Sequence, residues 1–96
     1  MDGNRVVYRF LIFGKVQGVG FRKYIKSIAD KHNLNGWTRN LSDGSVEAII
    51  EIADEKLDDI CALIKKGPSK SEVDKMLVQN ISYNIDNIGF VISKDA

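Results

Sequence analysis

A glycine-rich segment, Gly14-Lys15-Val16-Gln17-Gly18-Val19-Gly20-Phe21-Arg22, separates an apolar run from a stretch with helical spacing. Three glycines within nine residues let the backbone turn sharply and bring its N–H groups close to a ligand. Successive amides in such a turn form a concave group of donors, and a following helix adds unpaired N–H groups and a positive dipole end. Arg22 falls in the first turn of that helix, where an exposed cation costs about 0.3–1 kcal/mol. The segment therefore predicts a strand-to-helix turn that binds an anion.

The sequences on either side of this loop predict a strand and a helix. Residues 6–13 are rich in β-branched and aromatic side chains and too short for a typical helix, which indicates a strand. From Phe21 to about Asn33 the apolar residues recur at helical spacing, which predicts an amphipathic helix. The sequence Asn33-Leu34-Asn35-Gly36 is typical of a helix end.

The middle of the chain predicts a hairpin followed by a second helix. Residues 37–41 and 46–52 indicate two strands joined by a turn at Ser42-Asp43-Gly44, with Val46, Ala48, Ile50 and Ile52 on one side. Asp54 is the predicted N-cap of the second helix, and Gly67-Pro68 ends it. The predicted core face of this helix consists of Leu57, Ile60, Cys61 and Ile64.

The last third of the chain has a weaker pattern. Residues 73–81 contain a predicted strand, residues 82–89 a loop, and residues 90–92 a short final strand. The pattern leaves open which side of the strand faces inward, either Val73, Lys75 and Leu77 or Met76, Val78 and Asn80.

The order strand, helix, strand, strand, helix, strand (βαββαβ) is that of a ferredoxin-like α/β plait, an α+β fold. Right-handed crossovers predict an antiparallel sheet of order 4-1-3-2, with both helices on one face and a short extra C-terminal strand. The first and second strands then run parallel on either side of the third, so their C-terminal ends reach the same edge. Arg22, just past the end of the first strand, and Asn40, at the end of the second, would face a shared cleft about 10 Å wide. A phosphoryl group and a water molecule could fit in such a cleft.

Length and charge limit the classes of function. Ninety-six residues suit one domain, residues 1–96, in which residues 1–5 are expected to be flexible. A formal net charge of +1 gives no general attraction to nucleic acid or to an anionic membrane, so neither is expected as a partner. The chain has no run that could span a bilayer and no secretory leader pattern, so a cytoplasmic protein is expected. The single Cys61 can form no internal disulfide.

Two motifs in this chain resemble those of the acylphosphatases. The segment from Gly14 to Arg22 resembles the family's phosphate-binding signature. Gly36-Trp37-Thr38-Arg39-Asn40, followed by Asp43-Gly44-Ser45-Val46, is similar to its second signature, and Gly67-Pro68 ahead of Val73-Asp74 is similar to a later segment. The resemblance runs from about Tyr8 to the end of the chain, and two long motifs in the right order are more specific than one glycine-rich loop.

The resemblance implies an α/β plait that hydrolyses the carboxyl-phosphate bond of a small-molecule acyl phosphate, giving a carboxylate and inorganic phosphate. It places the catalytic arginine at Arg22 and the catalytic asparagine at Asn40. It also implies that no metal and no cofactor take part and that inorganic phosphate is both product and inhibitor. A monomer is expected, although the sequence leaves the oligomeric state open. The implied phosphate-binding residues, acting through backbone amides and the arginine side chain, are Lys15, Val16, Gln17, Gly18, Val19, Gly20, Phe21 and Arg22.

These residue types suit phosphoryl transfer. The guanidinium of Arg22 can hold phosphoryl oxygens in a bidentate way and stays charged at any relevant pH. The carboxamide of Asn40 cannot act as a base, but it can accept a hydrogen bond from water and hold that water in line with the breaking bond. The leaving carboxylate has a conjugate acid with a pKa of about 4, so it needs little protonation to depart.

A non-catalytic phosphate- or anion-binding module on the same fold is the alternative, since fold does not determine function. Asn40 separates the two, because a sensor needs Arg22 and the loop but has no use for an in-line water. An RNA-recognition domain is disfavoured because its glycine-aromatic signature is absent. A P-loop nucleotide-binding site is disfavoured because the Gly-Lys-Ser/Thr ending of that motif is absent.

Three further features bear on the predicted site and on the resemblance to the acylphosphatases. Lys15, Lys23 and Arg39 could raise the local positive potential and speed anion capture. Thr38 stands where the family commonly has a bulkier aliphatic residue, which leaves the local packing open. The end of the chain, residues 93–96, does not resemble the aromatic or basic ending common in the family, where the end of the last strand can help to hold the active-site arginine.

Overall fold

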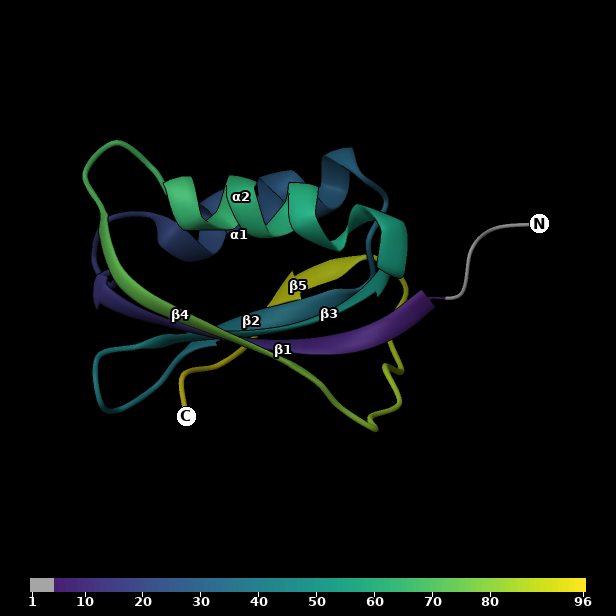
Figure 1. Ribbon diagram of the computed structural model, residues 1–96. Helices are drawn as coiled ribbons and strands as arrows, with labels where there is room; N and C mark the ends of the chain where they lie inside the picture. The colour runs from purple at the N-terminus through teal and green to yellow at the C-terminus, as the bar shows by residue number, and fades with distance from the viewer. Residues whose placement is uncertain (1–4) are drawn as a thin grey trace.

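The computed structural model describes residues 5–96, which fold into one five-stranded sheet covered by two helices. Figure 1 shows both helices on one face of the sheet, as the sequence predicts for an α/β plait. The strand order is β4-β1-β3-β2-β5, and all neighbours are antiparallel except β2 and β5, which are parallel. The elements are β1 (Arg5–Lys15), α1 (Phe21–Lys31), β2 (Gly36–Asn40), β3 (Val46–Ala53), the 3₁₀ turn η1 (Asp54–Lys56), α2 (Leu57–Lys66), β4 (Glu72–Asn80) and β5 (Phe90–Ile92).

The hydrophobic core lies between the helices and the inner face of the sheet. The predicted alternation in β3 is confirmed, because Val46, Ala48, Ile50 and Ile52 are buried there. β1 runs antiparallel to β3 and contributes Tyr8, Phe10 and Ile12, while the helices contribute chiefly Phe21, Ile25, Ile60 and Ile64. Burying each large apolar side chain contributes about 1.5–3 kcal/mol to the stability of the fold. The packing of β1 and β3 against the helices therefore fixes the helices relative to the sheet.

A β-bulge decides which side of β4 faces the core. The register with β1 pairs Phe13 with Lys75 but Gly14 with Val73, so one residue of β4 is skipped between these pairs. Val73 therefore packs against the core together with Met76 and Val78, and both of the alternatives left open by the sequence are partly right. Leu77 lies on the outer face and is exposed.

The start of the second helix differs from the prediction. The 3₁₀ turn η1 precedes α2, and no side chain caps either segment. The predicted N-cap, Asp54, is therefore wrong: its carboxylate instead accepts a hydrogen bond from the hydroxyl of Tyr8. The predicted core face is confirmed, since Ile60 and Ile64 are buried and both Leu57 and Cys61 pack against the core.

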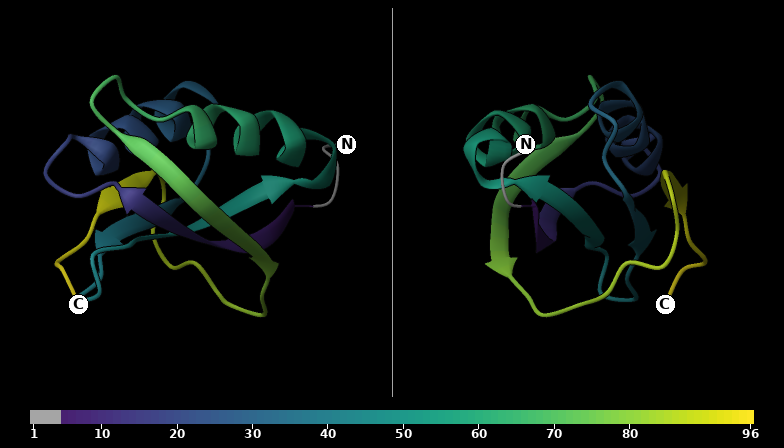
Figure 2. Two further views of the ribbon diagram at one scale, coloured as in Figure 1. Left: turned by 60° about the vertical axis from the view of Figure 1, so that its left-hand side comes forward. Right: turned by 90° about the vertical axis from the view of Figure 1, so that its right-hand side faces the viewer.

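The two ends of the described chain take different courses. Of the expected flexible residues 1–5, only Arg5 is described, and it begins β1. Residues 81–89 cross the sheet on the side opposite the helices, from β4 at one edge to β5 at the other (Figure 2). Within residues 5–96, no helix combines the length and the apolar character needed to cross a membrane.

The C-terminal residues continue along β2 beyond the short strand β5. The N–H of Ser93 donates to the carbonyl of Thr38 at 2.8 Å, and the N–H of Ala96 donates to the carbonyl of Asn40 at 3.0 Å. The side chain of Thr38 is buried and donates to the carbonyl of Glu47 at 2.7 Å, so the polar residue at this position is satisfied locally. The chain end therefore arrives beside the last residue of β2.

Candidate active site

The glycine-rich loop leaves the first turn of α1 without a side-chain cap. Gly20 is the N-cap residue and has φ 79°, and Gly18 has φ 74°, so both adopt left-handed conformations that favour glycine. A Cβ at either position would meet no atom within 4 Å, so these positions favour glycine for its backbone conformation and not for lack of space. No acidic side chain lies in the first turn, which leaves its N–H groups and the positive end of the helix dipole available to an anion.

Two apolar side chains anchor this loop to the core. Val16 and Phe21 are each only 1% exposed, whereas Lys15, Gly18 and Gly20 between or beside them are exposed. The ring of Phe21 also packs against Gly67 at the end of α2, where a Cβ would lie 2.9 Å from its Cε2 atom. The loop is thus fixed at both ends while its backbone stays open to solvent.

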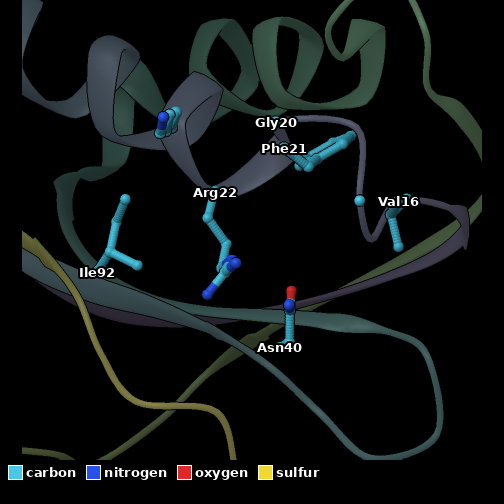
Figure 3. Close-up of a pocket in the computed structure, with 8 residues that line it drawn as sticks. Val16, Gly20, Phe21, Arg22, Asn40 and Ile92 are labelled. Atoms are coloured by element: carbon cyan, nitrogen blue, oxygen red, sulfur yellow. The ribbon is translucent and has the colours of Figure 1, made fainter.

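A pocket of about 360 Å³ lies between this loop and the end of β2. In Figure 3, Arg22 reaches from the start of α1 toward the sheet, and Asn40 points from the end of β2 toward the loop. The predicted meeting of these two side chains is therefore found in the structure. The pocket is lined by Val16, Gly18, Gly20, Phe21, Arg22, Lys23, Asn40 and Ile92.

The carboxamide oxygen of Asn40 is the unusual polar atom of the pocket. This Oδ1 atom is buried, and within residues 5–96 it has no hydrogen-bond partner. Leaving a buried acceptor unsatisfied costs about 1–3 kcal/mol, so native structures rarely keep one without a reason. The position of Asn40 allows this oxygen to accept a hydrogen bond from a molecule bound in the pocket.

Arg22 already has one partner, Asp95, which the sequence did not single out. Its Nη1 atom donates to Asp95 Oδ1 at 3.0 Å, and the two side chains are 35% and 56% exposed. An exposed pair of this kind contributes about 0–1 kcal/mol, which suffices to orient the guanidinium without locking it. Although residues 93–96 do not resemble the ending common in the family, they contact the arginine through the side chain of Asp95.

Three residues of the predicted phosphate-binding segment do not line the pocket. Lys15 ends β1 and pairs with Glu72 of β4, and Val19 packs against the core. The side chain of Gln17 turns toward the connection between β2 and β3. Only the backbone of these residues remains as a candidate for phosphate binding.

Of Lys15, Lys23 and Arg39, which are expected to raise the local positive potential, only Lys23 lines the pocket. Arg39 lies on the outer face of the sheet, with its guanidinium carbon 5.1 Å from the Trp37 ring centroid and its Nε 2.7 Å from Glu47 Oε1. Glu47 is 4% exposed and also accepts from Arg9 at 2.6 Å. Burial raises the pKa of Glu47, but the hydrogen bonds and charges of the two arginines outweigh it and hold this pKa below its ordinary value. Arg39 thus serves a structural ion-pair network.

Comparisons with known proteins agree with this geometry. The acylphosphatase family model matches residues 8–92. A protein of Helicobacter hepaticus described as an acylphosphatase is 48% identical, over 80% of this chain and 83% of its own. The crystal structure of acylphosphatase from Bacillus subtilis superposes with a TM-score of 0.85 at 34% identity, covering 92% of this chain and 98% of that one. The crystal structure of full-length HypF in a phosphate- and nucleotide-bound form superposes with a TM-score of 0.86 at 30% identity. It covers 99% of this chain but only 13% of its own. With its glycine-rich loop, its paired Arg22 and Asn40 and these relatives, the chain belongs to the acylphosphatase family.

Proposed function

We propose that this protein hydrolyses small acyl phosphates at the pocket that Arg22 and Asn40 share, without a metal or a cofactor. The observation that carries the proposal is the buried, unpartnered Asn40 Oδ1 atom in a pocket whose opposite wall is an uncapped helix N-terminus. An anion and a water molecule are the two species that such a pair of walls would bind together.

The phosphoryl group binds to the loop and the arginine. Backbone N–H groups of residues 15–21 and the first turn of α1 donate to its oxygens, while the guanidinium of Arg22 contributes charge and the donors that Asp95 does not use. Val16 and Phe21 support this assignment because their burial fixes the loop before the ligand arrives, so little ordering is needed on binding.

Asn40 positions the attacking water. Its Oδ1 atom accepts a hydrogen bond from that water and holds the oxygen in line with the phosphorus and the leaving oxygen. The water oxygen bonds to phosphorus while the bond from phosphorus to the acyl oxygen breaks, and the carboxylate leaves with the bonding electron pair. The proton of the water passes to an oxygen of the substrate's own phosphoryl group, so no basic side chain is required.

The acyl half of the substrate would extend toward the mouth of the pocket. Ile92 of β5 lines this region and is 39% exposed, so it offers an apolar contact without enclosing the ligand. A small acyl group fits such an open edge. Inorganic phosphate would bind in the same loop as the product does and act as a competitive inhibitor.

We further propose that the protein is a monomer of one domain, residues 1–96. It acts in the cytoplasm and takes neither nucleic acid nor membrane as a partner. The net charge of +1 supports the absence of a general attraction to polyanions. Sedimentation equilibrium would test the monomer.

Hydrolysis of benzoyl phosphate tests the function. We expect the wild type to turn over in the presence of EDTA, with inorganic phosphate as a competitive inhibitor, and Arg22→Ala to lose both phosphate binding and turnover. Asn40→Ala should keep phosphate binding and lose turnover. Arg5→Ala, at the far end of β1, and Asn84→Ala, exposed in the 81–89 connection, are matched controls that should behave as the wild type.

Two outcomes would contradict the proposal. Normal turnover by Asn40→Ala would remove the role given to that side chain. A wild type that binds phosphate but does not hydrolyse the substrate would favour the alternative, a non-catalytic phosphate-binding module.

A further inference from the structure

The side chain of Gln17 connects the two halves of the site. Its Nε2 atom donates one hydrogen bond to the carbonyl of Leu41 at 2.8 Å and another to the carbonyl of Ser45 at 2.9 Å. Both carbonyls belong to the turn between β2 and β3, whose first residue directly follows Asn40. The backbone of Gln17 belongs to the glycine-rich loop that lines the pocket, so Gln17 contacts both the loop side and the β2 side of the site.

The turn receives these bonds at a point that is already ordered internally. The N–H of Leu41 donates to the carbonyl of Ser45 at 2.9 Å, and Asp43 Oδ1 accepts from the N–H of Ser45 at 2.9 Å. These contacts shape the turn but do not join it to the loop. Among the side-chain hydrogen bonds of residues 5–96, those made by residues 15–20 are the two of Gln17.

An uncharged amide side chain of this length suits the contact. A carboxamide nitrogen carries two N–H donors without a charge, and both are used here on two neighbouring carbonyls. A glutamate of the same shape offers acceptors only, and a methionine of similar length offers neither donor.

We propose that Gln17 is a positioning residue that holds Asn40 at a fixed distance from the phosphate-binding loop. This proposal rests on the proposed function, because it concerns the water that Asn40 orients. Leu41 is covalently joined to Asn40, so fixing the Leu41 carbonyl fixes the backbone from which the catalytic carboxamide projects. The Asn40 carbonyl also accepts a hydrogen bond from the N–H of Ala96 at 3.0 Å, so both the glycine-rich loop and the C-terminal residues hold the end of β2.

The Gln17→Met variant tests the proposal, because it keeps the length of the side chain and the backbone amide while removing both donors. Small errors of position in a reacting group reduce rates strongly, so we expect kcat for benzoyl phosphate to fall about tenfold to a hundredfold. The inhibition constant of inorganic phosphate should stay near the wild-type value, since the loop amides are unchanged. Tyr8→Phe removes one side-chain hydrogen bond, within β1 and away from the pocket. It is the control for a general loss of stability and should keep wild-type kcat.

A double-mutant cycle separates positioning from a purely structural effect. In the Asn40→Ala background the oriented water is already lost, so adding Gln17→Met should slow the residual reaction far less than it slows the wild type. An unchanged kcat in Gln17→Met would overturn the proposal. An equal loss in both backgrounds, or a parallel weakening of phosphate inhibition, would also overturn it.

Amide hydrogen exchange decides the question independently of turnover. Inorganic phosphate should slow exchange in residues 41–45 of the wild type, because loop and turn are connected, and this protection should be lost in Gln17→Met. Protection that persists in the variant would refute the connection. If the wild type shows no hydrolysis at all, the proposed function fails, whereas the exchange result still tells whether Gln17 couples the two segments.

Discussion

Neutralising Asp95 should tighten the binding of inorganic phosphate. The carboxylate lies 3.0 Å from Arg22 Nη1, so it competes with an anionic ligand for the guanidinium and repels that ligand across the pocket. In Asp95→Asn the amide keeps nearly the same shape but carries no charge. Phosphate either displaces Asp95 from Arg22 or binds beside the ion pair. In both cases, removing the negative charge of Asp95 lowers the free energy of the phosphate complex relative to the free enzyme.

The exposure of the two side chains sets the size of the effect. Arg22 is 35% and Asp95 56% exposed, so the pair belongs to the class of solvent-exposed ion pairs, which contribute about 0.2–1 kcal/mol. Since about 1.4 kcal/mol corresponds to a tenfold change in affinity, the inhibition constant of phosphate should fall by up to about fivefold. Such a pair is also screened by salt, because the Debye length falls from about 10 Å at 0.1 M to about 3 Å at 1 M.

The assay is inhibition of benzoyl phosphate hydrolysis by inorganic phosphate, measured at low and at high sodium chloride concentration. Asp86→Asn, an exposed aspartate in the 81–89 connection, is the control for a change of net charge. Weaker phosphate binding in Asp95→Asn would refute the reasoning, because it would mean that Asp95 assists the arginine more than it competes with the ligand. A gain well above tenfold would refute the treatment of the pair as exposed.

Three further predictions concern the loop, the outer face and β2. Gly20→Ala should lower the free energy of unfolding by about 1–2 kcal/mol and weaken phosphate inhibition, since alanine disfavours the φ of 79° although the added methyl group meets no atom; an unchanged melting temperature would contradict this. Ionised Glu47 is stabilised in the folded state, so its stabilising contribution is present above the pKa of the unfolded chain and is lost as the pH falls through the lower folded pKa. Glu47→Gln should therefore flatten the loss of stability measured by chemical denaturation below about pH 4, and an acid limb as steep as that of the wild type would disprove it. Thr38→Val removes the hydrogen bond to the Glu47 carbonyl and should cost about 1 kcal/mol in urea unfolding with unchanged kcat; a loss of turnover would show that the site depends on this bond.

The fold could be predicted from the sequence where one period governs a whole segment. In β3 the apolar residues at every second position, Val46 to Ile52, all face the helices, so the alternation gave the correct side. In β4 the bulge opposite Phe13 and Gly14 changes the register within the strand, and no single alternation describes Val73 and Met76 together. The bulge depends on pairing with β1 across the sheet, which local spacing does not encode.

The site could be predicted where a motif and the topology act together. Arg22 follows β1 and Asn40 ends β2, which runs parallel to β1, so their meeting needed only the strand order. Asp95 was missed because its contact depends on the course of the tail beyond β5 along β2, and the four residues that end the chain have no pattern of their own. The side chain of Gln17 was missed because the motif predicts a backbone role for it.

The position of β1 determines the order in which the sheet can be completed during synthesis. Among the strands of the sheet β1 is made first, but it lies inside the sheet, and both of its neighbours, β3 and β4, come later in the chain. Its pairing with β4 joins Tyr8 to Asn80, so the second edge of β1 stays open until β4 has been made. An open strand edge is a template for pairing with another chain. Fragments that end before β4 should therefore associate with one another, and the nascent protein depends on rapid synthesis and pairing of β4 to avoid aggregation.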